Sequence, residues 1–262
     1  MSRAYRIWAP PYRHRSGGVR CLYRLAALLR TSGLEATVNE KPGNVDYIAV
    51  YPETVRELNP FGAPHFVRYM LHRPGVVGGP RSYPKNVLKV WYNGIYKGSD
   101  DGPVLTIQTI ELDLFNLQGV GIRDTTSTWI GRAERRGYMQ GKPVGETIIK
   151  HNWPPTRKGV ADLLKRSKVL FTYEPFTALM TEAGLCGCPT IIMTDMAKYP
   201  ISRKEIAEMG WNPPGAGWGL GELEKAKETI SQVLPNYLAT EEATKEQLKA
   251  FIEITQNMRE KK

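Results

Sequence analysis

Short runs of Val, Leu, Ile and Phe, separated by segments with helical spacing, recur along the chain and predict an α/β fold. The clearest example lies between Val169 and Met193, where the runs VLFTY and PTIIM flank a segment that opens just after Pro175. We interpret these pieces as a buried strand, a helix and a second buried strand, which together form a βαβ unit.

The first half of the chain shows the same alternation with shorter elements. A strand over Tyr5–Ala9 is followed by the glycine turn Gly17–Gly18 and by a helix over residues 19–33 with apolar positions at helical spacing. Further strands are expected at Leu34–Val38, Tyr47–Tyr51, Phe66–Leu71, Lys89–Tyr92 and Val104–Ile107, with helical material at Thr54–Leu58. The pattern predicts a Rossmann-like domain with abbreviated helices.

Residues Asn116–Asp124 read as a linker, because they combine two glycines and polar flanks with no periodicity. We therefore predict two domains, 1–123 and 124–262. Before the βαβ unit, the second is expected to hold strands at Ser127–Ile130 and Thr147–Lys150 and a helix at Gly159–Lys165. After it come a Gly/Pro/Trp loop at Gly210–Gly221, either a flap or a packed connection, and a helix from Glu241 to about Met258.

The composition is that of a soluble globular protein, with 41% hydrophobic and 24% charged residues in 262. No apolar run is long enough to span a bilayer and the first residues lack a signal-peptide core, so a cytoplasmic location is expected. The three cysteines predict reduced thiols. Cys186-Gly-Cys188 lacks the second pair that a zinc site needs, so no metal is assigned.

The charge is basic and uneven. The formal net charge is +10, and residues 1–123 hold 16 Lys/Arg against 9 Asp/Glu while residues 124–262 hold 20 against 17. A basic first half suggests an anionic partner such as nucleic acid or a membrane surface, and a merely solvated basic face is the alternative.

Two glutamates bracket the helix of the βαβ unit. Glu174 stands where the first strand ends and Glu182 lies two i,i+4 steps further on, so both side chains are expected on one face. A second candidate is the basic turn with Arg132 and Arg136. His72 follows a predicted strand, at the sheet edge where α/β domains place ligands.

These motifs resemble those of a known family. The segment EPFTALMTEAGLCGCP, from Glu174 to Pro189, resembles the E-x7-E segment and following G-x-P turn of retaining, nucleotide-sugar-dependent glycosyltransferases with the GT-B fold (glycosyl transferases group 1). Gly131-Arg132-x-x-x-Arg136-Gly137 resembles that family's G-R-x(n)-K-G turn, with Arg136 where Lys is usual. The turn Gly17–Gly18 before a helix is similar too.

The resemblance implies two Rossmann-like domains that face a central cleft, with the C-terminal helix crossing back to the first. It implies that Glu182 binds the ribose of the donor and Glu174 hydroxyls of its sugar. Arg132, Arg136 and the free N–H groups at Phe176, Thr177 and Ala178 would stabilise the leaving diphosphate. Gly17 and Gly18 would let a phosphate or acceptor approach a helix N-terminus, and a simple tight turn is the equal alternative.

The expected donor is a nucleotide-sugar, a UDP-hexose, used without cofactor or metal. The chain departs from the family between Gly137 and Glu174, where too few residues remain for the usual two or three βα repeats. The second domain must therefore be shortened, which leaves the wall that binds the base undefined. His72 is the candidate for the family's active-site histidine by position alone.

The leading expectation is a retaining transferase whose acceptor is a polyanion, with hydroxymethylated pyrimidine in DNA, as in phage hypermodification, preferred. A glycan or lipid-linked acceptor in envelope biosynthesis is the first alternative. A sugar-nucleotide epimerase or hydrolase and a non-catalytic nucleic-acid-binding module are the others. Nothing in the sequence sets the oligomeric state.

Overall fold

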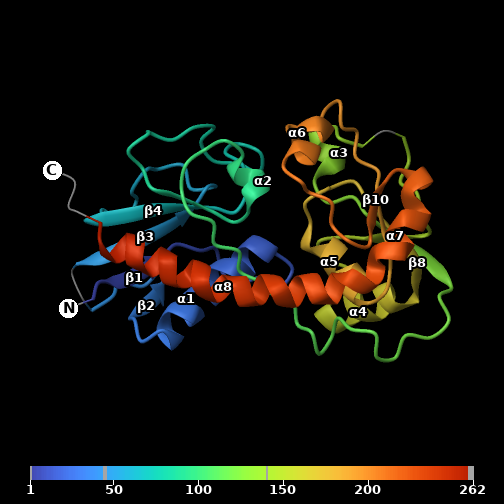
Figure 1. The fold of residues 1–262 in the computed structure, drawn as a ribbon, viewed down its shortest axis with the longest axis horizontal. Helices are drawn as coiled ribbons and strands as arrows, with labels where there is room; N and C mark the ends of the chain where they lie inside the picture. The colour runs from blue at the N-terminus through green and yellow to red at the C-terminus, as the bar shows by residue number, and fades with distance from the viewer. Residues whose placement is uncertain (1, 44–45, 140, 259–262) are drawn as a thin grey trace. The chain divides into compact units, whose positions relative to one another are not determined.

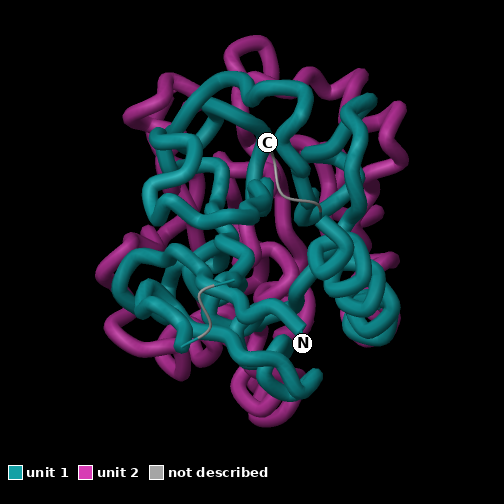
Figure 2. The backbone as a smooth tube through the Cα atoms, turned by 90° about the vertical axis from the view of Figure 1, so that its left-hand side faces the viewer, with its two compact units in different colours: residues 1–109, 240–262 teal, residues 110–239 magenta. Residues whose placement is uncertain are grey.

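The computed structural model describes residues 2–43, 46–139 and 141–258 (Figure 1). The chain divides into two compact units, coloured separately in Figure 2. Unit 1 comprises residues 1–109 and 240–262, and unit 2 comprises residues 110–239. The division falls before the linker expected at Asn116–Asp124, and the chain returns to unit 1 at its end.

Unit 1 contains a parallel five-stranded sheet with the order β2-β1-β3-β4-β5. The strands are β1 (Ala4–Ile7), β2 (Ala36–Val38), β3 (Tyr47–Pro52), β4 (His65–Met70) and β5 (Lys89–Trp91), and the helices are α1 (Gly17–Thr31) and α2 (Gly94–Lys97). In register, Tyr5 pairs with Ala36 on one side and with Ile48 on the other. The chain therefore reverses its direction of winding at β1, as in doubly wound folds.

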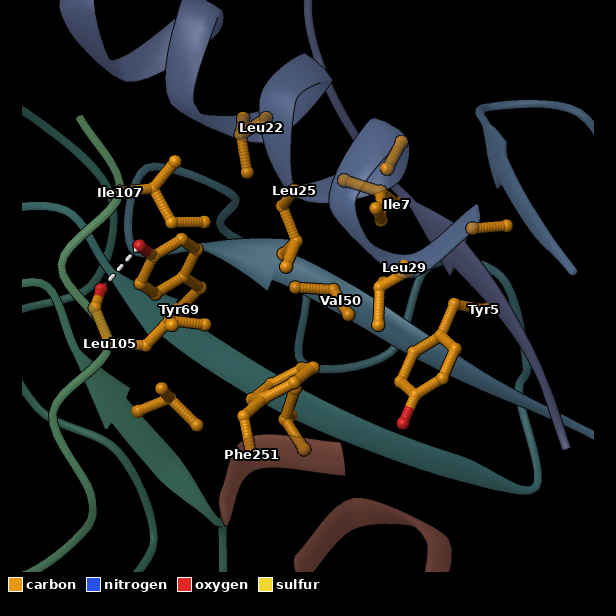
Figure 3. Close-up of a cluster of buried hydrophobic side chains, with 14 of the residues drawn as sticks. Tyr5, Ile7, Leu22, Leu25, Leu29, Val50, Tyr69, Leu105, Ile107 and Phe251 are labelled. Atoms are coloured by element: carbon orange, nitrogen blue, oxygen red, sulfur yellow. Dashed lines mark hydrogen bonds between the residues drawn. The ribbon is translucent and has the colours of Figure 1, made fainter. Parts of the chain in front are cut away.

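The core of unit 1 lies on one face of this sheet, where α1 and the C-terminal part of α8 (Val233–Gln256) both pack (Figure 3). Alternate residues of β1 and β3 point to this face, and Phe251 of α8 joins the same cluster as Leu25 of α1. The opposite face is covered by a smaller cluster that includes Tyr51, Val55 and Ala63, from β3 and the segment after it. The expected return of the C-terminal helix to the first domain is confirmed.

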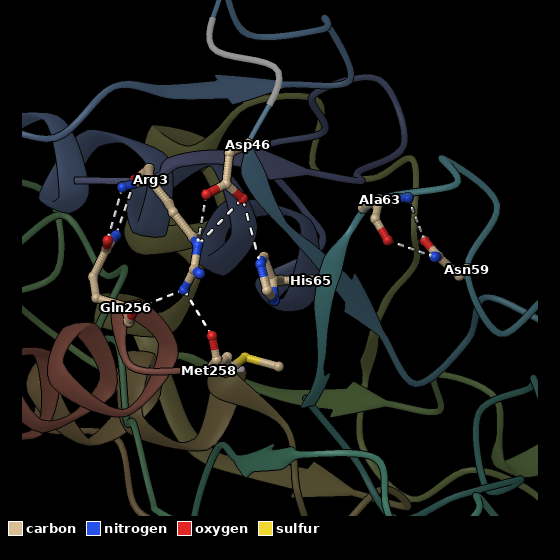
Figure 4. Close-up of polar contacts among 7 residues, drawn as sticks. All are labelled: Arg3, Asp46, Asn59, Ala63, His65, Gln256 and Met258. Carbon is tan, nitrogen blue, oxygen red and sulfur yellow. Dashed lines mark hydrogen bonds and ion pairs between the residues drawn. The ribbon is translucent and has the colours of Figure 1, made fainter. Parts of the chain in front are cut away.

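Polar contacts fasten the end of α8 to β1 (Figure 4). The guanidinium of Arg3 donates to the backbone carbonyls of Gln256 (2.7 Å) and Met258 (2.8 Å), and its Nε donates to Asp46 (3.0 Å). The Gln256 side chain bonds both backbone groups of Arg3, and Asp46 lies 3.4 Å from Nε2 of His65. The end of α8 is thus held through the carbonyl groups of its last residue, Gln256, and of Met258 just beyond it.

Unit 2 contains a second parallel five-stranded sheet with the order β10-β9-β8-β6-β7. When the strands of each sheet are numbered from 1 along the chain, both sheets have the order 2-1-3-4-5. The strands are β6 (Thr125–Trp129), β7 (Thr147–Ile149), β8 (Ser167–Thr172), β9 (Thr190–Ile192) and β10 (Ala216–Trp218). The helices and 3₁₀ turns are α3 (Ala133–Arg136), α4 (Arg157–Arg166), α5 (Ala178–Leu185), α6 (Arg203–Glu208), η1 (Leu220–Glu222), α7 (Leu223–Thr229) and η2 (Ile230–Gln232). The α/β class with parallel sheets is confirmed.

Helices cover both faces of the second sheet. Side chains of α4, α5 and the start of α8 form one cluster with Leu170 of β8, and Ala226 of α7 joins another with Phe171. The predicted linker contributes to this unit, because Arg123 donates to the carbonyls of Leu164 (3.1 Å) and Cys186 (2.8 Å), near the ends of α4 and α5.

Two predicted elements of unit 1 are wrong. Thr54–Leu58 is not helical, because the buried guanidinium of Arg68 takes the carbonyl groups of Val55, Glu57 and Leu58. Val104–Ile107 is not a strand. Val104 forms one bridge to β5, and the backbone N–H and carbonyl of Thr106 bond side chains of α8.

Two boundaries in the second half also differ from expectation. The segment Gly210–Gly221 is not all loop, since it includes β10 and η1. Helix α8 begins at Val233 rather than Glu241, because Pro235 falls in its first turn, where no intrahelical N–H donor is needed.

Candidate functional site

The two motifs singled out in the second half of the sequence meet at one point of unit 2. Gly131 and Arg132 follow the carboxyl end of β6, and Glu174 follows the carboxyl end of β8, the adjacent strand. The order of the sheet reverses between these two strands, and such a switch point is where open α/β sheets bind their ligands. The fold thus places the motifs where a ligand is expected.

The carboxylate of Glu174 is held by three N–H donors. Its Oε1 accepts from the backbone N–H and from Nε of Arg132, both at 2.9 Å, and its Oε2 accepts from the indole N–H of Trp129 at 3.0 Å. The backbone of Glu174 is fixed in turn by the hydroxyl of Thr172. The side chain is 14% exposed, so it is rigid and still reachable.

Gly131 is required by this arrangement. Its φ is +58°, in the left-handed region that favours glycine, and a Cβ built there would overlap the Glu174 carboxylate. The glycine of one motif therefore makes room for the glutamate of the other.

Arg132 combines an anchored Nε with a half-exposed side chain. Its Nη groups donate to no acceptor among the described residues, so they are available to an anion. Arg136, the last residue of α3, is exposed, and Gly137 ends the helix in a left-handed conformation. The structure brings Arg132 to Glu174 and leaves Arg136 outside these contacts.

Helix α5 begins beside Glu174. Thr177 is its N-cap and accepts from the N–H of Leu179 (3.4 Å), while Ala178 is exposed at the first position. Phe176 packs against Trp211 at 4.8 Å between ring centroids. This helix start offers N–H groups toward the carboxyl edge of the sheet.

Glu182 is not exposed to this edge. Its two oxygens accept from Nη2 (2.7 Å) and Nη1 (3.0 Å) of Arg157, which also bonds Glu111 at 2.9 Å and lies over the ring of Phe115. Burial alone would lower the pKa of Arg157, but the bonds and charges of Glu182 and Glu111 outweigh it and raise the pKa. A role for Glu182 at a ribose stays a prediction, and any ligand there must meet Arg157 as well.

The turn after β7, residues 150–156, connects the residues around Glu174 to those around Glu182. His151 meets the Trp129 ring edge to face at 5.0 Å, and the turn ends at Thr156, the N-cap of α4, just before Arg157. One end of the turn therefore contacts the group that holds Glu174, and the other leads into the group that holds Glu182.

In unit 1, Gly17 and Gly18 are the first residues of α1 rather than a turn before it, and Ser16 caps the helix. A Cβ at Gly18 would make only an ordinary contact with Leu71, so packing does not require glycine there. His72 is buried and stacks on Tyr96 at 4.4 Å. Its Nδ1 accepts from the N–H of Arg73 (2.8 Å), so the neutral ring carries its proton on Nε2 and acts there as a donor.

Sequence reasoning missed Trp129, Arg157 and the turn before Arg157. The Trp129 indole has no motif of its own. The usable signal for Arg157 was its place at a helix start, directly after Pro154-Pro155-Thr156.

None of the described helices is both long and apolar enough to span a membrane. A scan against protein-family models finds no match, and a search of the curated proteins finds none either.

Proposed function

We propose that this protein is a retaining glycosyltransferase that moves a hexose from a nucleotide diphosphate sugar, a UDP-glucose-like donor, to a hydroxyl acceptor. The observation that carries the proposal is the meeting of Gly131-Arg132 with Glu174 at the switch point of unit 2, two motifs 42 residues apart in sequence. Each resembles a motif of that enzyme family, and the glycine of one fits the glutamate of the other.

The roles follow from the contacts. Glu174 has one acceptor position left on Oε2, which suits a sugar hydroxyl. Arg132 and the N–H groups at the start of α5 stabilise the charge that develops on the leaving diphosphate. The bond from the sugar C1 to phosphate oxygen breaks, the bond from C1 to acceptor oxygen forms on the same face, and the acceptor proton passes to the diphosphate.

The charge supports an anionic acceptor. Unit 1 holds 20 Lys/Arg against 12 Asp/Glu, a net charge of +8, out of +10 for the whole chain. The loops after β1 and β4, residues 8–16 and 71–88, carry five Lys/Arg and no Asp/Glu. We propose DNA with hydroxymethylated pyrimidines as the acceptor, with its phosphates bound by unit 1.

The test is transfer of labelled hexose from UDP-glucose to duplex DNA with hydroxymethylated cytosine, compared with unmodified DNA. We expect label in the modified DNA alone, an α-linked product from the α-linked donor, and activity that falls steeply with salt. Arg132→Ala should lower kcat/KM by about 10²- to 10³-fold, as for loss of one charge-stabilising group. Arg135→Ala, an exposed arginine of the helix that follows Arg132, is the control and should change little.

The other outcomes separate the alternatives. Label in a glycan or lipid but not in DNA would reject the DNA acceptor and keep the transferase. UDP release that proceeds equally with and without acceptor would indicate a hydrolase. If Arg132→Ala and Arg135→Ala behaved alike, the assignment of the site would be wrong.

A further inference from the structure

We infer that Trp153 is a stacking platform for a nucleobase, the base of the donor nucleotide; this rests on the proposed function. The domain is short in the region where a base-binding wall was expected, and no motif in the sequence supplies a replacement. Trp153 is 44% exposed, the most exposed of the six tryptophans, in the turn that follows β7. Tryptophan is enriched at binding surfaces, where its ring offers an apolar face and its N–H a polar edge.

The turn that carries Trp153 is pinned at both ends. The N–H of Lys150 donates to the carbonyl of Trp153 (2.8 Å) and the N–H of Trp153 donates back to Lys150 (3.1 Å). The next residue, Pro154, is buried and packs against Gly159 of α4, where a Cβ would lie 3.1 Å from it. The ring is thus presented on a fixed backbone, which reduces the entropy lost when a ligand stacks on it.

The turn lies next to groups that the donor would contact. His151, two residues before Trp153, touches Trp129, whose indole holds the carboxylate of Glu174. Arg157, four residues after Trp153, holds Glu182. We therefore place the nucleoside of a donor held at Glu174 and Arg132 at this turn.

The residues of the turn indicate which kind of ligand stacks on Trp153. Lys150 and His151 are exposed and precede Trp153 in the turn, and residues 150–157 include no carboxylate. An exposed aromatic ring in a turn that carries Lys150 and no carboxylate fits a nucleobase attached to phosphates, and base stacking on an aromatic ring tolerates different bases. A base presented by single-stranded DNA has the same chemistry, so the experiment includes both sources.

The test measures affinity by calorimetry for UDP, for glucose 1-phosphate, which lacks a base, and for a thymidine dodecamer. Trp153→Ala should weaken UDP binding about 5- to 150-fold, the loss expected when one base–aromatic stack is removed. Trp153→Phe keeps a ring and should lose much less. Glucose 1-phosphate should bind equally to all variants. Trp218→Phe, a half-buried tryptophan of the same unit, is the control and should bind UDP as the unchanged protein does.

Each result decides the proposal. If Trp153→Ala weakened the dodecamer but not UDP, the stacked base would belong to nucleic acid, and the assignment to the donor nucleotide would be overturned. Unchanged affinity for both UDP and the dodecamer would overturn it, and so would equal weakening of glucose 1-phosphate. If the unchanged protein transferred sugar while Trp153→Ala had no effect, this inference alone would fail. If the unchanged protein bound no nucleotide and no dodecamer, the proposed function would fail with it.

Discussion

The contact between Gly131 and Glu174 makes Gly131→Ala the most informative single substitution. The new methyl group would occupy the space of the Glu174 carboxylate, so the carboxylate must move away. It would then lose its bonds from Arg132 and Trp129. Both the stability of unit 2 and any activity that uses Glu174 should fall.

The magnitude has two parts. Placing alanine at a φ of +58° costs about 1–2 kcal/mol relative to glycine. Displacing the carboxylate adds about 2–3 kcal/mol, because hydrogen bonds to a charged group are worth about 1.5–3 kcal/mol each and water replaces part of them at this partly exposed site. We therefore expect a loss of about 3–5 kcal/mol in the free energy of unfolding.

The assay is equilibrium urea unfolding followed by circular dichroism. The control is Gly137→Ala, because Gly137 has a similar φ of +74° and a Cβ there meets nothing within 4 Å. It should cost only the backbone part. In a Glu174→Ala background, Gly131→Ala should also cost only that part. The reasoning is refuted if Gly131→Ala and Gly137→Ala are equally destabilising, or if the Glu174→Ala background gives no relief.

Three further predictions concern the rest of the fold. Burial raises the pKa of each thiol of Cys21, Cys186 and Cys188 to about 12, so none should react with Ellman's reagent at pH 8 until the protein unfolds; rapid reaction of the native protein would contradict this. The backbone N–H of Trp218 is the chief cause that lowers the pKa of Glu222, so Glu222→Gln should reduce the free energy of unfolding by up to about 1 kcal/mol at pH 7. Urea unfolding of both proteins at falling pH should show this difference disappear as the Glu222 carboxyl protonates. A difference that stays constant with pH would contradict the prediction. Arg3→Ala should speed hydrogen exchange in the last turn of α8, measured by mass spectrometry against Arg24→Ala, and cost about 1–3 kcal/mol; equal exchange in both variants would argue against the role of Arg3.

The fold was predictable where hydrophobic pattern and local geometry agree. The strand β3 is buried at every position from Tyr47 to Pro52, and the run VLFTY became β8, so the βαβ unit around α5 was visible in the sequence. Val104–Ile107 has the same apolar character but is not a strand, because after one bridge to β5 the backbone groups of Thr106 bond side chains of α8, more than 100 residues away. No local pattern carries that information.

The candidate site was predictable in part. The motifs drew attention to Gly131, Arg132 and Glu174, which the fold brings together, although the sequence could not tell that the glycine and the carboxylate share one space. The environment of Glu182 was not predictable. An isolated glutamate in an apolar stretch shows no sign of its partner, and Arg157 reaches it only because α4 and α5 pack side by side.

The division of the chain has a consequence for the order of folding. Residues 110–239 form all of unit 2, whereas the core of unit 1 includes Leu248 and Phe251 near the C-terminus. As the protein leaves the ribosome, the second sheet has its complete set of residues first, while the apolar face of the first sheet waits for the end of α8. A ribosome that stops just after residue 239 would therefore release a chain whose unit 2 is complete and whose unit 1 leaves the apolar face of its sheet uncovered.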